Sequence, residues 1–169
     1  MKKIRDICEL TPAYLHKEGI TALLVDLDNT LAGYREDQPD ETVCFWLRDV
    51  LAAGITVMVI SNAKEERAAR FCKPLGLPYI AKAGKPGKRG IESALRELEC
   101  KPDQAMMVGD QMFTDIWAGK NAGVRTVLVD PRTRGFWTAV RRGIEIPLIY
   151  IFCWNRRCKD NTYTTKEWL

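Results

Sequence analysis

The fold follows from one stretch of the chain, TALLVDLDNT at residues 21–30. Its first part is an apolar run of the kind found in strands buried in a parallel sheet, and we predict a strand over residues 21–27. Asp26 and Asp28 stand at its end, and alternate residues of a strand point to the same side. At the carboxyl end of a parallel strand, that side faces the crevice in which open α/β sheets bind ligands.

Apolar runs and amphipathic patterns alternate along the rest of the chain. We predict further strands at 55–60, 79–81, 105–108 and 124–129, and helices at 12–18, 40–53, 65–72, 87–98 and 113–121. The helix at 40–53 carries an apolar stripe at helical spacing, formed by Val43, Trp46, Leu47, Val50 and Leu51. The alternation predicts an α/β fold, with a parallel sheet flanked by helices on both faces.

The composition is that of one globular domain. The chain has 169 residues, of which 46% are apolar and 28% charged, and this is ample for a single packed core. We expect one domain over residues 1–169, with a core at about 20–130 and a C-terminal tail at 131–169. The net charge of +4 belongs to the tail, because residues 131–161 hold seven basic side chains against two acidic ones.

The cysteines favour neither a zinc site nor a disulfide framework. The six cysteines contain no C-x-x-C pair, and the one histidine is His16. The first residues are polar and charged and include no apolar signal segment. We therefore expect reduced thiols in a cytoplasmic protein.

The paired carboxylates of Asp26 and Asp28 need an explanation. Two carboxylates at one strand end repel each other unless a cation or a shared proton compensates. Mg²⁺ prefers oxygen ligands and is a natural compensator. The alternative is that one or both aspartates cap a turn after the strand.

Three further predicted strands also end in polar residues. Ser61 and Asn62 follow the second strand, and Lys85 follows the third. Asp110 ends the fourth, and Asp115 lies just inside the next helix. Taken singly, such residues are helix caps, solvated lysines or favourable charges in a helix's first turn. Taken together, at the ends of four consecutive strands, they favour one site for a phosphate group and Mg²⁺.

These residues resemble the four motifs of the haloacid dehalogenase (HAD) superfamily. The motifs are DLDNT at 26–30, SN at 61–62, KP at 85–86 and GDQMFTD at 109–115. With LTP at 10–12, PLG at 74–76 and KAGKP at 82–86, the chain is similar to the YqeG family of subfamily IIIA. That family includes mitochondrial phosphatidylglycerophosphate phosphatases. The resemblance implies a Rossmann-like HAD fold and a hydrolase acting on phosphoric monoesters.

The resemblance also implies a role for each site residue. Asp26 is the nucleophile that forms an aspartyl-phosphate, and Asp28 is the general acid and base. Mg²⁺ joins Asp26, the backbone carbonyl of Asp28, and Asp110. The remaining site residues are Ser61, Asn62 and Lys85 as phosphate-binding groups, and Thr30 and Asp115 as groups that support the site from behind.

No cap domain is expected. HAD enzymes usually carry one after the first or second motif, but residues 29–39 and the stretch from 61 to 85 are too short for a separate lid. An open site admits a bulky phosphate, and phosphatidylglycerophosphate is the leading substrate on the resemblance. The alternatives are a soluble sugar-phosphate or nucleotide phosphatase and, from another class, a non-catalytic HAD-fold binding module.

The tail suggests where the protein works. Residues 144–154 are mostly apolar, too short to span a bilayer, and flanked by two arginine pairs. This pattern is consistent with peripheral contact on the inner face of an anionic membrane, or with packing on the core or in a homo-oligomer. No nucleic-acid partner is expected, because aromatic and basic residues form no recognisable binding module.

Overall fold

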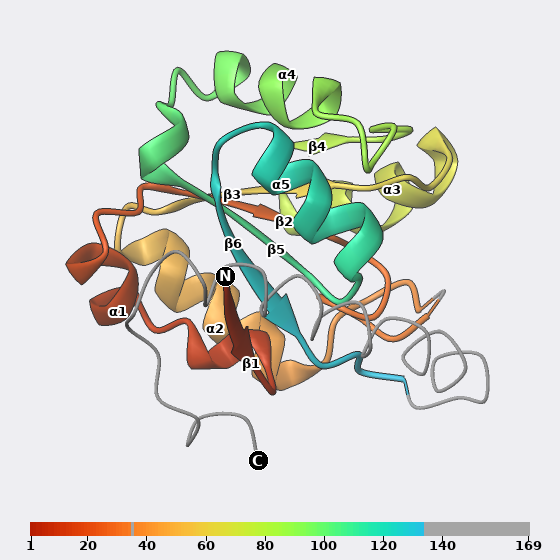
Figure 1. Ribbon diagram of the computed structural model, residues 1–169. Helices are drawn as coiled ribbons and strands as arrows, with labels where there is room; N and C mark the ends of the chain where they lie inside the picture. Colours follow the sequence, from red (N-terminus) through yellow and green to blue (C-terminus); the bar gives the residue numbers. More distant parts are fainter. Residues whose placement is uncertain (35, 134–169) are drawn as a thin grey trace. The chain divides into compact units, whose positions relative to one another are not determined.

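The computed structural model describes residues 1–34 and 36–133 of the chain. Met1–Thr133 form one compact unit (Figure 1). Predictions about residues 134–169 therefore lie outside the described residues. The elements are, in chain order, β1 (Lys2–Ile4), η1 (Ile7–Glu9), α1 (Pro12–Lys17), β2 (Ala22–Val25), α2 (Glu41–Ala52), β3 (Thr56–Ile60), α3 (Glu65–Cys72), η2 (Lys73–Leu75), β4 (Tyr79–Ile80), α4 (Arg89–Glu97), η3 (Pro102–Gln104), β5 (Ala105–Gly109), η4 (Met112–Ile116), α5 (Trp117–Asn121) and β6 (Arg125–Val129).

The strands form one parallel sheet in the order β1-β6-β5-β2-β3-β4. From β2 the chain winds to β3 and β4 on one side and later to β5 and β6 on the other. The winding direction reverses beside β2, and this is the position at which open α/β sheets bind ligands. The predicted α/β class is confirmed, and no cap domain interrupts the described elements.

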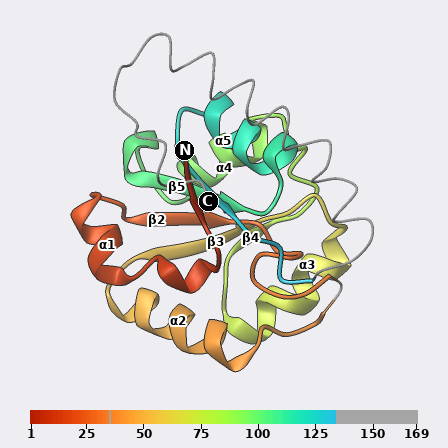
Figure 2. The ribbon, with the colours of Figure 1, turned by 60° about the horizontal axis from the view of Figure 1, so that its bottom comes forward.

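Helices cover both faces of the sheet, as predicted (Figure 2). Leu23 and Val25 of β2 lie in one apolar cluster, together with residues of α1, α2 and α3. Ala22 and Leu24 lie in a second cluster, with residues of α4 and α5. The alternation of a strand's side chains thus builds two cores on opposite faces of one sheet. In the described part of the chain, no helix has the length and apolar character needed to cross a membrane.

The helix starts follow from local sequence signals. Thr11 caps α1 by accepting a hydrogen bond from the Tyr14 N–H at 3.2 Å, and Asp40 caps α2 by accepting one from the Val43 N–H at 2.9 Å. The apolar stripe of α2 is buried at four of its five predicted positions, and Leu51 is the exception, with 43% of its surface exposed. Leu51 lies in the last turn of the helix.

Strand β1 is the element that the sequence pattern missed. It pairs with β6 in parallel register, Ile4 opposite Val129, and only Ile4 among its three residues is buried. Two lysines and one isoleucine carry no periodic signal. The strand forms because β6 offers an unpaired edge, which is tertiary information that no short window contains.

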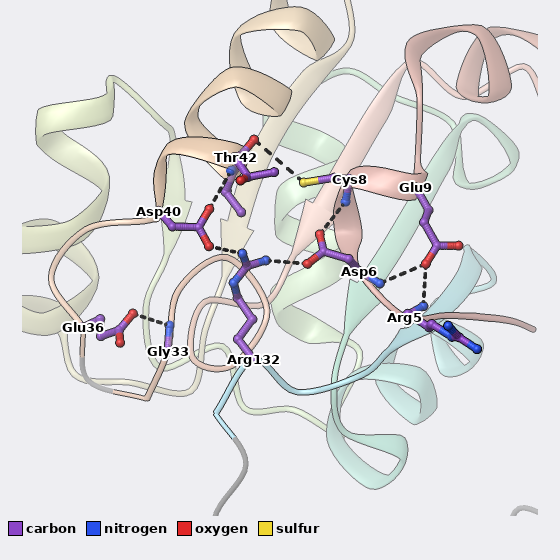
Figure 3. A network of polar contacts seen from close by, with 10 residues as sticks. Arg5, Asp6, Cys8, Glu9, Gly33, Glu36, Asp40, Thr42 and Arg132 are labelled. Atoms are coloured by element: carbon purple, nitrogen blue, oxygen red, sulfur yellow. Dashed lines mark hydrogen bonds and ion pairs between the residues drawn. The ribbon is translucent and has the colours of Figure 1, made fainter.

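A polar network fastens the end of the described chain to its beginning (Figure 3). The guanidinium of Arg132 donates to the Asp6 carboxylate at 3.1 Å and also to the Asp40 carboxylate. Asp6 in turn caps η1 by accepting from the Cys8 N–H at 2.9 Å. One arginine therefore joins two helix caps and the segment after β6.

Candidate active site

Asp26 and Asp28 follow β2 and have different partners. β2 ends at Val25 rather than at residue 27, and the Leu27 carbonyl accepts a hydrogen bond from the Leu31 N–H at 3.1 Å. Asn29 sits in the left-handed region at φ 68°. Because the chain turns here, the strand is two residues shorter at its end than the predicted range of 21–27, and the two carboxylates have different partners: Asp26 contacts Lys85, whereas Asp28 contacts Arg67.

Lys85 is the centre of the buried polar cluster. Its Nζ donates to Asp26 Oδ1 at 2.5 Å, to Asp115 Oδ1 at 2.6 Å and to the Ile60 carbonyl at 2.7 Å. A lysine ammonium has three donors, and all three are used. The side chain is only 2% exposed, so Lys85 is not a solvated loop residue, and its contacts link the ends of β2, β3 and β5.

Burial and the neighbouring charges shift the pKa values of this cluster in opposite directions. Burial raises the pKa of Asp26 to about 7, although the ammonium of Lys85 acts to lower it. Burial by itself would lower the pKa of Lys85, but the carboxylates of Asp26 and Asp115 outweigh it and hold that pKa above its usual range. Lys85 is therefore charged at neutral pH, and it helps to keep Asp26 ionised in a buried position.

Asp115 lies on η4, a single π-helical turn that follows β5. Its second oxygen, Oδ2, accepts from the Gln111 N–H at 3.0 Å, so both oxygens have partners. Such π-turns are frequent at functional sites. The carboxylate lies directly against Gly109, where a Cβ would overlap it. Gly109 begins the GDQMFTD motif because a larger side chain there would occupy the space of the Asp115 carboxylate.

Replacing Gly109 with Ala is expected to damage both stability and activity. The added methyl group collides with the Asp115 carboxylate, so Lys85 loses one of its three partners. We expect a loss of about 1–3 kcal/mol in the free energy of unfolding, together with a fall in phosphatase activity of roughly tenfold or more. Denaturant unfolding and a steady-state assay measure the two effects.

Gly19→Ala is the control for this prediction. Gly19 has open space around the position of a Cβ but a φ of 68°, so alanine there costs about 1–2 kcal/mol through backbone strain alone. Gly19 lies at the end of α1, away from the polar cluster. A Gly19→Ala protein that loses as much activity as Gly109→Ala would mean that activity merely follows stability.

Ser61 and Asn62 lie beyond the end of β3, but they differ in what their side chains do. Ser61 is 3% exposed, and its Oγ accepts from the Ala63 N–H at 3.1 Å. Asn62 was predicted to bind phosphate. Instead, its Nδ2 donates to the Lys85 carbonyl at 2.8 Å and its Oδ1 accepts from the Lys85 N–H at 2.9 Å. The Asn62 amide is thus committed to holding the Lys85 backbone.

The candidate metal ligands are carboxylates at the ends of β2 and β5. Asp26, Asp110 and Asp115 each offer an oxygen, and these three oxygens lie within 4.8 Å of one another. Hard oxygen donors of this kind suit Mg²⁺. Three carboxylates and one ammonium also carry a combined charge of −2 when ionised, which a divalent cation balances. The residues therefore fit the predicted ion.

The loop after Asp28 is anchored to the segment after β6. The Asn29 carbonyl accepts from the Arg132 N–H at 3.1 Å, and its Oδ1 accepts from the Thr133 N–H at 3.3 Å. Thr30 is completely buried, and among the described residues its hydroxyl has no hydrogen-bond partner. No hydrogen bond of the Thr30 hydroxyl among the described residues thus supports its predicted role, whereas the hydrogen bonds of Asn29 hold the loop in place.

Arg67 is a site residue that sequence reasoning missed. It lies on α3, and its Nη2 donates to Asp28 Oδ1 at 2.9 Å. In the sequence it is one charge among several in a short polar helix, which is the usual pattern of a solvated face. The signal becomes visible only when α3 is placed beside the loop that carries Asp28.

The described cysteines do not supply a nucleophile. Cys8, Cys44, Cys72 and Cys100 are free thiols, as expected for those four. Burial raises the pKa of both Cys8 and Cys72 to about 12, and a thiol with such a pKa is scarcely ionised at neutral pH.

The fold and site together define a class: a Rossmann-like α/β protein whose buried carboxylates and lysine meet at the point where the winding of the sheet reverses. Residues 2–123 match the family model of the haloacid dehalogenase-like hydrolases. The chain belongs to this family, as its motifs predicted. The predicted class of enzyme, a hydrolase of the phosphatase type, is confirmed as well.

Individual relatives agree with this assignment. The chain is 35% identical over 146 residues to "Probable phosphatase YqeG" of Bacillus subtilis (strain 168), covering 84% of each chain. It is 30% identical over 143 residues to chloroplastic phosphatidylglycerophosphate phosphatase 1 of Chlamydomonas reinhardtii, covering 78% of this chain and 53% of that one. A crystal structure of a haloacid dehalogenase-like hydrolase from Brucella suis 1330 shares the fold, with a TM-score of 0.54 at 12% identity over 76% of this chain and 94% of that one.

Proposed function

We propose that the protein is a Mg²⁺-dependent phosphomonoester hydrolase that works through an aspartyl-phosphate on Asp26. The observation that carries this proposal is the contact of the buried Lys85 ammonium with both Asp26 and Asp115. It keeps a carboxylate ionised at the ligand-binding edge of the sheet, where a carboxylate nucleophile needs to be.

In the first step, a carboxylate oxygen of Asp26 attacks phosphorus in line with the leaving oxygen. The bond between phosphorus and the leaving oxygen breaks, and Asp28 gives that oxygen a proton. The products are the free alcohol and a mixed anhydride between Asp26 and phosphate. Ser61 donates to an equatorial oxygen, and the ammonium of Lys85 beside Asp26 balances the negative charge that is spread over these oxygens.

In the second step, water hydrolyses the mixed anhydride. Asp28, now ionised, removes a proton from the water as its oxygen attacks phosphorus. The bond between phosphorus and the Asp26 oxygen breaks, which releases inorganic phosphate and restores the carboxylate. Asp28 is left protonated for the next cycle, so the protons balance.

The other predicted groups support this chemistry. Asp26, Asp110 and the backbone carbonyl of Asp28 would hold the ion, which supplies positive charge beside the phosphate when it is bound. Asp115 holds Lys85, since both of its oxygens are already engaged. Asn62 holds the backbone of the same lysine, and we assign it to positioning rather than to the phosphate.

Phosphatidylglycerophosphate is the substrate that we propose. Support comes from the chloroplastic relative that bears this name and from the absence of a cap over the described elements, which leaves room for a lipid head group. The proposed location is the cytoplasm, with peripheral contact on the inner face of the membrane through the basic, partly apolar tail.

Removal of residues 144–169 tests this substrate and location. We expect hydrolysis of phosphatidylglycerophosphate in anionic vesicles to fall roughly tenfold, because each lost Arg or Lys near the surface removes about 1 kcal/mol of attraction. Hydrolysis of p-nitrophenyl phosphate is expected to stay within about twofold, because a freely diffusing substrate needs no membrane contact.

The thermal midpoint is measured alongside both assays. Parallel loss of both activities with a lost melting transition would assign the tail to the core and remove the membrane proposal. Rapid hydrolysis of a sugar phosphate or nucleotide by the full chain, with none of the lipid, would replace the proposed substrate with a soluble one.

A further inference from the structure

Arg67 makes three contacts with the loop that follows the first motif. Its Nη2 donates both to Asp28 Oδ1, at 2.9 Å, and to the backbone carbonyl of Glu36, at 2.6 Å. Its Nη1 lies 3.7 Å from Asp37 Oδ1. One side chain on α3 therefore reaches the beginning and the end of the segment from residue 28 to residue 37.

The position of Arg67 is defined by its surroundings. Only 16% of the side chain is exposed, and its guanidinium carbon lies 5.7 Å from the centre of the buried Phe71 ring. Nε and Nη1 are buried and make no hydrogen bond among the described residues. The guanidinium of Arg67 has lost much of its hydration, so it is not a solvated surface charge. In return it contacts Asp28 and the loop that follows.

We propose that Arg67 is a positioning residue for the reaction, which orients the Asp28 carboxylate and fastens the loop at 28–37 to α3. The inference rests on the proposed role of Asp28 as general acid and base. Transfer of a proton requires Asp28 to lie within hydrogen-bond reach of the leaving oxygen and of the attacking water. Because no cap domain interrupts the described elements, Arg67 supplies from within the core fold a restraint that keeps Asp28 there.

Arg70 is a matched control. It lies one turn further along α3 and pairs with the same partner, since its Nη1 is 3.6 Å from Asp37 Oδ2. Its side chain is 63% exposed, and its ion pair among the described residues is the one with Asp37. Arg67 and Arg70 thus share a helix, a charge and a partner, and they differ in burial and in the contacts with Asp28 and the Glu36 carbonyl.

The two steps of the reaction can be followed separately with p-nitrophenyl phosphate. Its leaving group departs as a stable anion, so the first step needs little help from an acid, and the burst of p-nitrophenolate reports attack by Asp26. The later steady state reports hydrolysis of the phospho-enzyme, which needs Asp28 as a base. Asp28→Asn serves as the reference and is expected to keep the burst while losing the steady state.

We expect Arg67→Gln to show the same pattern as Asp28→Asn. The burst rate stays within about threefold of wild type, while the steady-state rate falls roughly tenfold or more, a part of the ~10²–10⁴-fold that general acid–base catalysis contributes. The double variant is expected to be no slower than Asp28→Asn alone. Arg70→Gln is expected to match wild type in both phases.

Several outcomes would overturn the inference. Arg67 does not act through Asp28 if Arg67→Gln loses the burst and the steady state equally, or if it keeps full activity. The same conclusion follows if the losses of the two single variants add in the double variant. If Arg67→Gln does not fold, Arg67→Lys is used, since one ammonium keeps the charge but not the planar fork, and the same split is expected. If Asp28→Asn itself shows no split between the phases, the proposed role of Asp28 fails first, and the two failures are thereby distinguished.

Discussion

Replacement of Asp26 by Asn is expected to lower kcat by roughly a thousandfold or more, which is about 4 kcal/mol of barrier. Asparagine has nearly the same shape and still offers an oxygen to Lys85, so the fold is kept while the nucleophile is lost. The measurement is steady-state hydrolysis of p-nitrophenyl phosphate, with a search by mass spectrometry for the phosphorylated aspartate in wild type. Asp103→Asn, at an exposed aspartate on η3, is the control and is expected to be fully active.

The same variant is expected to melt no lower than wild type in metal-free buffer at pH 8. Burial raises the pKa of Asp26 to about 7 from the ordinary value of 3.8 for an aspartate, so the folded state binds the proton more tightly than the unfolded state. The ionised form therefore costs stability, a cost that is absent below pH 3.8 and complete above pH 7. Asparagine carries no charge and therefore removes this cost.

An Asp26→Asn protein that keeps more than roughly a tenth of wild-type kcat would falsify the assignment of the nucleophile.

The second large effect concerns the ion. Asp110→Ala is expected to weaken Mg²⁺ binding roughly a hundredfold, about 2.7 kcal/mol, and Ser61→Ala no more than about threefold. Asp110 contributes an anionic oxygen at the end of β5, whereas Ser61 offers a neutral hydroxyl that already accepts from the Ala63 N–H. Calorimetric titration of both variants with Mg²⁺ gives the comparison.

Removal of Mg²⁺ with a chelator provides the accompanying test on the wild-type protein. Activity is expected to disappear and to return when Mg²⁺ is added back, because the ion balances the charge of Asp26, Asp110 and Asp115. Equal losses of Mg²⁺ affinity in Asp110→Ala and Ser61→Ala would place the ion elsewhere, and activity that survives the chelator would remove it from the mechanism.

Much of the fold could be predicted because its strands are buried on both faces. The run before Asp26 and the runs at 55–60 and 105–108 are continuous and apolar, which is a strong signal in a short window. The ends of these strands then place Asp26, Ser61 and Asp110 at one edge by topology alone. Site residues of this kind are predictable because the backbone, rather than a side-chain conformation, brings them together.

The remaining features depend on contacts that no local pattern encodes. β1 forms only because β6 presents an open edge. Asp28 finds its partner on α3, because Arg67 of that helix donates to it. From the sequence alone Arg67 is expected to be a surface charge, because its contact with Asp28 forms only when α3 packs beside the loop. Asn62 stands next to Ser61 in the motif, but the path of the chain brings the Lys85 backbone within reach of its amide.

The pairing of β1 with β6 also sets an order of events during protein synthesis. The ribosome makes residues 2–4 before their partners at 127–129, which emerge only after more than a hundred further residues. Until then Ile4, which is buried in the finished protein, has no partner strand. A nascent chain that stops before β6 also leaves the edge of β5 open to pairing with another chain. β1 is thus made before β6 but paired only after it, and Arg132 can join Asp6 to Asp40 only once the whole sheet has been synthesised.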